Sequence, residues 1–222
     1  MVTFLYMVRH CQSMGNVEDK FQGRYDSPVS PLGEKQLDLL SLRFRNVRLD
    51  GVFASPLQRA MRTGEAVARF HGLTVQPREE FIELDVGELD NVTQAELARL
   101  RPDIVRDWDV TPDLLSFPGG ETMTQAYERS VAAVRGIARE NAGKTIAVVT
   151  HGGILRCIDA CARFGSLEGM RRARDTYRVG NTGISLLKVE DDRLSWEFFN
   201  DLKHLPPEYI TRFSVKPEED EG

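Results

Sequence analysis

Residues 4–16 read FLYMVRHCQSMGN, and this stretch decides the class of fold. Its first five residues are apolar, with aromatic and β-branched side chains, and such a run predicts a buried strand. The run stops abruptly at Arg9 and His10, and a polar loop follows. Residues 145–150, TIAVVT, end in the same way, because His-Gly-Gly at residues 151–153 comes directly after them. Ligands of open α/β sheets bind beyond the carboxyl ends of strands, so we expect the two strand ends to meet around a site.

The rest of the chain alternates between helical and extended patterns. Ser-Pro pairs at residues 30–31 and 55–56 predict two helix starts, and Ser30 suits the N-cap position. Thr122 caps a long helix that is predicted to run to about Asn141. The helix predicted to start at residues 55–56 is expected to bury the side made by Leu57, Met61, Val67 and Phe70. The remaining stretches expected to be extended are 51–54, 73–75, 81–84, 184–189 and 194–199, the last two as a hairpin.

Helices that lie between short buried strands predict an α/β fold. We expect a three-layer sandwich, in which a mostly parallel sheet carries helices on both faces. The length suits a single domain, placed at residues 1–215. The pattern weakens at residues 87–118, where two short helices near 94–100 and 103–108 predict a small helical lid. Residues 216–222, KPEEDEG, are acidic and predicted to be a disordered tail.

Composition and charge argue against several classes of protein. The net charge of −5 does not favour nucleic acid as a partner. No apolar run approaches the roughly 20 residues of a membrane span, so no membrane is expected as a partner. The N-terminus lacks a basic n-region and a small-residue cleavage site, which predicts a cytoplasmic protein. Cys11, Cys157 and Cys161 do not resemble a disulfide framework, and no His or Cys cluster completes a metal site.

The residue types at the two strand ends suit the chemistry of anions. Arg9 presents a planar fork of donors that matches phosphate or carboxylate. His10 can change protonation near neutral pH, and a neutral imidazole is a competent nucleophile. The two residues could equally be a basic pair on the surface. The glycines after His151 would let backbone N–H groups at a helix start approach a ligand, or would only form a tight turn.

Two further charged residues are candidates, and each has an ordinary alternative. Arg59 lies in the first turns of a helix that follows a strand, where an anion is favoured. Most helical arginines are solvated, however, and taken alone Arg59 is better read as structural. Glu83 lies between apolar neighbours, so it could be desolvated and keep a proton, as a general acid must. Taken alone, an outward-facing glutamate on a strand is the better interpretation of Glu83.

Taken together, these segments resemble the histidine phosphatase superfamily, which includes the cofactor-dependent phosphoglycerate mutases. The first motif is Arg9-His10 with Ser13 and Asn16. The other matching positions are Phe21-Gln22-Gly23, Asp26, Pro28, Leu32, Gly33, residues 55–60 with Thr63, Glu83, Gly87, residues 118–121, residues 150–153 and Asn181-Thr182. The match keeps the family's order from Val8 to Leu187, so it covers most of the chain.

The resemblance implies a mechanism and a set of roles. His10 would attack phosphorus and form a phosphohistidine, and Glu83 would protonate the leaving alcohol and then deprotonate the attacking water. Arg9, Arg59 and His151 would hold the phosphoryl oxygens, and Asn16 would donate a further hydrogen bond. Residues implied to bind the phosphate in addition are Gln22, Gly23 and Gly152. No metal and no cofactor are implied, and the substrate would be a small phosphorylated metabolite.

The chain departs from the family pattern in two places. Cys11 replaces the family glycine after the nucleophile. This change could be tolerated, could impair activity or alter the substrate, or could give redox control. The family's Glu-Gly pair after Gly87 is also changed, to Glu-Leu-Asp-Asn at residues 88–91. We expect the lid to contact the substrate through Arg101, Arg106 or Trp108. Because of this change, the sequence does not determine which of the three makes the contact.

The predicted function is a metal-independent phosphomonoester phosphatase, a hydrolase of the phosphoglycerate mutase-like branch. A phosphoglycerate mutase is the first alternative, and the short lid without clustered arginines or prolines argues against it. A non-catalytic interaction or sensing protein on the same fold is the second, and Cys11 is what motivates it. The edge strand at residues 194–199 could pair between chains, so a homodimer is possible.

Overall fold

A computed structural model of the chain describes residues 1–173 and 179–211, and the predicted acidic tail at 216–222 lies outside them. Within the described residues, six strands form one sheet in the order β4-β3-β6-β1-β7-β8. The strands are β1 (Thr3–Arg9), β3 (Gly51–Ala54), β4 (Val75–Pro77), β6 (Thr145–Thr150), β7 (Ile184–Glu190) and β8 (Arg193–Asp201). No helix in the described ranges is long and apolar enough to cross a membrane.

The strand that opens the chain lies in the middle of the sheet. β1 pairs with β6 in parallel, with Arg9 opposite Thr150, and with β7 in antiparallel orientation. β3 runs parallel to both β6 and β4. The carboxyl ends of β1, β3 and β6 therefore meet at one edge, which is where the sequence places His10, Ser55 and His151.

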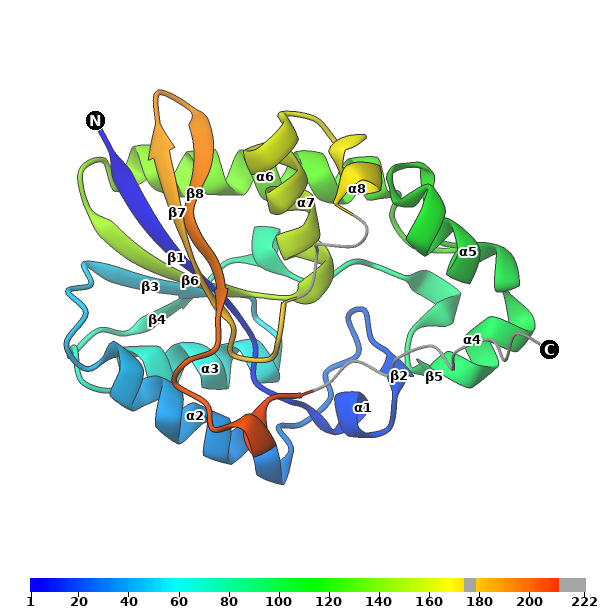
Figure 1. Cartoon of the computed structure of the whole chain (residues 1–222), viewed down its shortest axis with the longest axis horizontal. Coiled ribbons are helices and arrows are strands. Elements are labelled where there is room, and N and C mark those ends of the chain that lie inside the picture. Colours follow the sequence, from blue (N-terminus) through cyan, green and yellow to red (C-terminus); the bar gives the residue numbers. More distant parts are fainter. Residues whose placement is uncertain (174–178, 212–222) are drawn as a thin grey trace.

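Two helical layers cover the sheet, which confirms the predicted three-layer α/β architecture (Figure 1). One face carries α2 (Pro31–Phe44) and α3 (Gln58–Ala68), and the other carries α6 (Met123–Glu140) and α7 (Gly152–Phe164). Because side chains alternate along a strand, β1 contributes to both cores. Leu5 and Met7 belong to the core cluster with α6 and α7, whereas Val8 belongs to the cluster with α2 and α3.

The helix starts follow from local hydrogen bonds, with one exception. Ser30 Oγ accepts from the amide of Gly33 at the start of α2, as predicted. Thr122 caps α6 in a capping box with Gln125, also as predicted. The helix expected at Ser55 instead begins at Gln58 and has no side-chain cap. The hydroxyl of Ser55 bonds to His151 in the site, and it also accepts from the amide of Leu57 just before the helix at 3.4 Å.

Two expectations at the sheet edge and on α3 are wrong. The stretch at residues 81–84 is not a strand of a sheet: Phe81 ends a 3₁₀ turn that begins at Glu79, Ile82 has an extended backbone, and the stretch pairs with no strand among the described residues. Phe70 was expected on the buried side of α3 but is 48 % exposed. The helix ends at Ala68, so the helical period no longer governs the direction of Phe70.

The region after Gly87 is helical, as predicted, and lies beside one end of the sheet (Figure 1). It contains β5 (Val92–Thr93), α4 (Gln94–Leu100), α5 (Pro102–Val110) and short 3₁₀ turns at Gly87–Leu89 and Pro112–Leu114. The other short elements are α1 (Met14–Val17), β2 (Lys20–Phe21), α8 (Gly169–Arg172) and a turn at Pro207–Tyr209. β2 pairs with β5, and the apolar side chains of the region join the core cluster of β1 and α7.

Candidate active site

Two histidine rings face each other beyond the sheet edge. His10 follows β1 and His151 follows β6, and their ring centroids are 5.0 Å apart at an angle of 52°. Both rings are buried, and Arg59 beside them is only 1 % exposed. The structure thus brings together residues that lie more than 140 positions apart in the chain, because the parallel pairing of β1 with β6 aligns their ends.

The backbone next to His10 decides which of its ring nitrogens carries a proton. His10 Nδ1 lies 2.6 Å from the carbonyl oxygen of Cys11. Since a carbonyl only accepts, Nδ1 carries the hydrogen and Nε2 keeps its lone pair. Burial, followed by the charges of Arg59 and Arg9, lowers the pKa of His10 well below its ordinary value of 6.5. The ring is therefore neutral near neutral pH, the form that can attack an electrophile.

His151 is held by a residue whose role the sequence did not reveal. Its Nε2 lies 2.7 Å from the hydroxyl of Ser55 at the end of β3. Its Nδ1 is buried and has no hydrogen-bond partner among the described residues. Burial is the main cause that lowers the pKa of His151, and Arg59 and His10 add to it. A serine directly after a buried strand was the available signal for this contact.

The two arginines supply the positive charge of the site. Arg59 Nη1 donates to the carbonyl of Tyr25 at 2.8 Å, and Nη2 donates to that of Gly23 at 2.9 Å. Arg9 Nη1 donates to the carbonyl of Val179 at 2.6 Å. These carbonyls orient the guanidinium groups in a fixed plane, and the interpretation of Arg59 as a solvated helical arginine is wrong. Its Nε atom is buried without a hydrogen-bond partner among the described residues.

Glu83 is buried rather than exposed on a strand, and its carboxylate lies against the start of α7. Its Oε1 accepts from the amide of Leu84 at 2.9 Å, and its Oε2 accepts from the amide of Gly153 at 3.1 Å. A Cβ atom at position 153 would lie 2.6 Å from Oε1, so only glycine allows this approach. Burial raises the pKa of Glu83 against the effect of these two bonds and of Arg59. A carboxyl group in this environment can hold and release a proton.

The other candidate phosphate-binding residues lie in one polar network. Asn16 Oδ1 accepts from both the amide and the hydroxyl of Ser13, and Gln22 Oε1 accepts from that same hydroxyl. Asn181 Nδ2 donates to Asn16 Oδ1 at 3.3 Å and to the carbonyl of His10 at 3.0 Å. Asn181 therefore links the side chain of Asn16 to the backbone of His10, a role that the sequence motif alone did not assign.

Of the two glycines in the candidate set, Gly23 has a structural reason to be glycine. A Cβ atom at Gly23 would lie 2.6 Å from the carbonyl oxygen of Leu84. Gly152 is the first residue of α7, and a Cβ atom there would lie 3.6 Å from Nε of Arg9, an ordinary van der Waals distance that does not require glycine. The stretch at residues 88–91, which differs from the family pattern, contacts the loop around Gly23. Asp90 accepts from the amides of Gly23 and Tyr25 at 2.8 Å each. Asp90 thus orders the loop whose carbonyls hold Arg59.

Cys11 is packed inside the molecule without backbone strain. Its φ angle is not positive, so a glycine is not required at this position. The side chain is fully buried and packs with Leu37 and Ala66. Burial raises the pKa of the thiol to about 11, which keeps it protonated and unreactive. This environment favours simple tolerance of the cysteine over redox control.

The expected lid contacts are occupied by neighbours. Arg101 binds Asp103 through two hydrogen bonds of 2.9 and 2.7 Å, and Arg106 binds Asp107 at 2.8 Å. Trp108 packs edge-on against Phe21. Across residues 1–173 and 179–211, no group of three His, Cys, Asp or Glu side chains is placed to hold a metal ion.

A mostly parallel sheet covered on both faces, with two histidines and two arginines beyond its carboxyl edge, is typical of the class of histidine phosphatases. The family model described as the histidine phosphatase superfamily (branch 1) matches residues 5–202, and the chain belongs to that family. It is a phosphatase enzyme of this superfamily.

Curated relatives and solved structures agree with this assignment. The chain is 30 % identical over 190 residues to phosphoserine phosphatase 1 of Hydrogenobacter thermophilus, covering 85 % of this chain and 88 % of that protein. It is 27 % identical over 205 residues to phosphoglycerate mutase-like protein 4 of Arabidopsis thaliana, covering 90 % and 86 %. The structure of Bacillus stearothermophilus YhfR superposes with a TM-score of 0.85 at 25 % identity, covering 91 % and 98 %.

Proposed function

We propose that this enzyme hydrolyses the phosphomonoester of a small metabolite through a phosphohistidine at His10, without a metal ion. The observation that supports this most directly is the hydrogen bond between His10 Nδ1 and the carbonyl of Cys11. It leaves the lone pair on Nε2 of a buried ring that lies beside the buried side chains of His151 and Arg59. A neutral nucleophile surrounded by fixed cationic groups is what phosphoryl transfer requires.

In the first step, His10 Nε2 attacks the phosphorus atom and the bond to the ester oxygen breaks. Arg9 and Arg59 bind the three equatorial oxygens, with His151 and Asn16 as further hydrogen-bond partners. Glu83 gives its proton to the leaving oxygen, so the product departs as an alcohol. The buried position of Glu83 supports this role, because burial favours its protonated form.

In the second step, a water molecule attacks the phosphorus of the phosphohistidine. Glu83, now ionised, takes a proton from this water, and the bond between nitrogen and phosphorus breaks. Inorganic phosphate leaves, and His10 returns to its neutral form with Glu83 protonated again. The fixed cations lower the barrier mainly by positioning and electrostatics, since the groups need little rearrangement between the two steps.

The names of the relatives indicate which substrate to test first. Relatives from Hydrogenobacter thermophilus and Arabidopsis thaliana are named phosphoserine phosphatases. Other relatives, such as that of Yersinia pestis at 29 % identity, are named probable phosphoglycerate mutase. We propose phosphoserine or a similarly small phosphorylated metabolite as the substrate, with mutase activity as the second candidate.

Release of phosphate from a panel of phosphorylated metabolites tests the proposal. We expect turnover of at least one small phosphomonoester by the wild type, no turnover by His10→Ala, and no loss of activity in EDTA. Conversion of 3-phosphoglycerate to 2-phosphoglycerate without release of phosphate would instead favour the mutase. Full activity of His10→Ala would contradict the proposal.

Two further predictions concern the surroundings of the enzyme. The three cysteines are free and buried, which supports the cytoplasmic location that we propose. β8 lies at an edge of the sheet, which supports pairing with a second copy in a homodimer. Size-exclusion chromatography with light scattering tests the dimer.

A further inference from the structure

The backbone around Glu83 is held by an ion pair that belongs to no part of the mechanism above. Arg129 on α6 and Glu121 before that helix are joined by a contact of 2.7 Å between Nη2 and Oε1. The two side chains are 21 % and 12 % exposed, so water screens the pair only in part. Both partners also bond to the segment that carries Glu83, from opposite sides of that residue.

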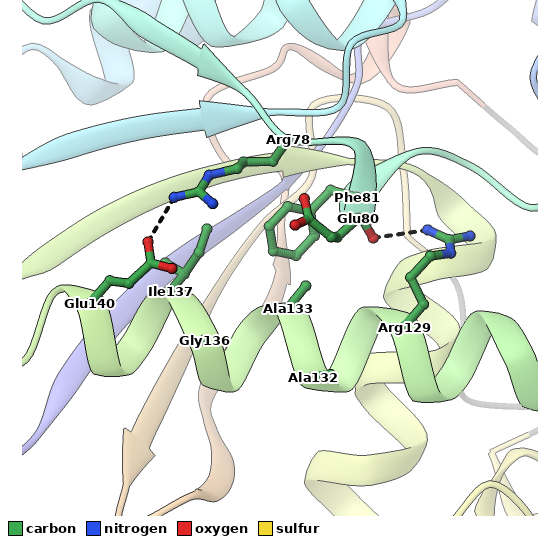
Figure 2. Close-up of a pocket in the computed structure, with 9 residues that line it drawn as sticks. All are labelled: Arg78, Glu80, Phe81, Arg129, Ala132, Ala133, Gly136, Ile137 and Glu140. Carbon is green, nitrogen blue, oxygen red and sulfur yellow. Dashed lines mark hydrogen bonds and ion pairs between the residues drawn. The ribbon is translucent and has the colours of Figure 1, made fainter.

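Arg129 binds the segment before Glu83. Its Nη1 donates to the carbonyl of Glu80 at 2.8 Å and to the carbonyl of Ile82 at 3.0 Å. Figure 2 shows the guanidinium reaching from α6 to the Glu80 carbonyl, across the end of a pocket of about 350 Å³. A charged donor makes stronger hydrogen bonds than a neutral one, so this contact restrains the backbone immediately before Glu83.

Glu121 binds the segment after Glu83. Its Oε1, the atom that meets Arg129, also accepts from the amide of Asp85 at 2.9 Å. Its own amide donates to the carbonyl of Asp85 at 2.9 Å. The ion pair therefore fixes the chain two residues after Glu83 as well as one residue before it.

Other contacts also restrain this segment. Thr150 Oγ1 donates to the carbonyl of Phe81 at 2.8 Å, the carboxylate of Glu83 meets the amide of Gly153, and Asp85 pairs with Arg24 at 3.1 Å. The side chains of Phe81 and Leu84 are buried in the core cluster. The stretch pairs with no strand among the described residues, so side chains replace the ladder of a sheet. Arg129 and Glu121 hold backbone groups of Ile82 and Asp85, so the direction of the Glu83 carboxyl group depends in part on their contacts.

We infer that Arg129 and Glu121 are positioning residues for proton transfer by Glu83. They do not touch the substrate; they hold residues 80–85 so that the carboxyl group of Glu83 faces the leaving oxygen. The inference rests on the proposed role of Glu83. A displacement of about 1 Å at a reacting group can cost roughly 100-fold in rate, so loosening this segment should slow the step that needs the proton.

The pocket in Figure 2 offers a matched control. Arg78 lies at its other end and pairs with Glu140 on the same helix, at 2.7 Å. This ion pair also links α6 to the stretch before the 3₁₀ turn, but the guanidinium of Arg78 contacts Glu140 and the ring of Phe53 rather than the backbone of residues 80–85. Arg78→Gln removes an ion pair of the same type without releasing Glu83.

The test compares two substrates that differ in their need for a proton. The p-nitrophenolate ion leaves without protonation, whereas the alkoxide of β-glycerophosphate needs a general acid. We measure kcat/KM, which reports the steps up to loss of the leaving group, for p-nitrophenyl phosphate and for β-glycerophosphate. The variants are Arg129→Gln, Arg129→Lys and Glu121→Gln, with Glu83→Gln as reference and Arg78→Gln as control. Thermal unfolding establishes which variants fold.

We expect Glu83→Gln to lose about 100-fold or more on β-glycerophosphate and much less on p-nitrophenyl phosphate. Arg129→Gln should follow the same pattern, with about 10-fold loss on β-glycerophosphate and less than about 3-fold on the aryl ester. Arg129→Lys and Glu121→Gln, which disturb the segment less, should lie between this variant and the wild type. Arg78→Gln should match the wild type on both substrates.

Two outcomes would overturn the inference, and they are distinguishable. In the first outcome, Glu83→Gln loses more kcat/KM on β-glycerophosphate than on p-nitrophenyl phosphate, as expected. The folded Arg129 and Glu121 variants, however, lose equally on the two substrates or lose nothing on either. The ion pair then has only a structural role. If Glu83→Gln itself loses activity equally on both substrates, the proposed role of Glu83 fails, and the positioning role fails with it.

Discussion

Among single residues, His10 shows how a neighbour sets chemistry. One carbonyl, that of Cys11, fixes the proton on Nδ1, and burial keeps the ring neutral. Glu83 is the complement, since burial favours its protonated form. The two residues thus reach opposite proton states through the same physical cause, because burial always disfavours the charged form.

The pH profile of kcat/KM follows from these directions. His10 works neutral and its pKa is lowered, so the loss of activity on the acid side should lie below pH 6.5. Glu83 works protonated and its pKa is raised above 4.5, so activity should fall as the pH rises through that pKa. We expect Glu83→Gln to lose the alkaline limb and keep the acid limb. An alkaline limb unchanged in Glu83→Gln would contradict this assignment; titration of the substrate affects both proteins equally.

Cys11 leads to a second prediction for a single residue. Its thiol fills space beside Leu37 and Ala66 and takes no part in the proposed chemistry. Cys11→Gly should therefore lower the free energy of unfolding by about 1–2 kcal/mol and keep turnover within about 2-fold. Chemical denaturation and the phosphate-release assay measure the two effects. A loss of activity without a loss of stability would show that the thiol acts in the site.

Local sequence patterns predicted which residues are candidates for the site better than they predicted whether the side chains are buried. Arg59 and Glu83 each have an ordinary interpretation as exposed charges, and both are buried. Their burial depends on carbonyls of Gly23 and Tyr25 and on the amide of Gly153, which come from distant parts of the chain. No pattern of neighbouring residues contains this information, so the local pattern offered the two residues only as candidates and the family resemblance assigned their roles.

Among the elements, the loop at residues 23–25 connects the region after Gly87 to Arg59 in the candidate site. Asp90 orders this loop through two amides, and the loop in turn orders Arg59. Asp90→Asn removes one acceptor, because an amide nitrogen cannot accept from a backbone N–H. We expect kcat/KM to fall about 10-fold and the unfolding free energy by about 1 kcal/mol.

The control for Asp90 is another carboxylate of the same region. Asp103 pairs with Arg101 on the exposed surface of the lid, and Asp103→Asn should leave kcat/KM unchanged. Steady-state kinetics on the preferred phosphomonoester measures both variants. Equal kinetics for Asp90→Asn and the wild type would contradict the coupling between the loop and Arg59.

Element boundaries were predictable where capping residues define them. Ser30 and Thr122 mark the starts of α2 and α6, and both predictions are confirmed. Residues 81–84 were predicted as extended in a sheet because their apolar residues suit a strand. Their carbonyls instead bond to Thr150 and Arg129, which lie far along the chain. Side chains from other elements thus replaced the strand partner that the local pattern implied.

For the whole molecule, the sheet order explains why one site forms. β1 lies between β6 and β7, and β3 lies beyond β6, so three strand ends reach the same edge. The order also explains why residues far apart in sequence can meet in one candidate site. The α/β architecture was predictable from the alternation of elements, whereas the antiparallel pairing of β7 with β1 was not, because strand order depends on contacts between distant segments.

The most direct measurement is the site of phosphorylation during turnover. Glu83→Gln, which should slow attack by water, is mixed with p-nitrophenyl phosphate, whose leaving group needs no proton, then quenched with base and mapped by mass spectrometry. The account predicts phosphate on His10 that is stable in base, labile in acid and absent from His10→Ala. Phosphate on Ser55 or Cys11, or turnover with no covalent intermediate at all, would contradict it.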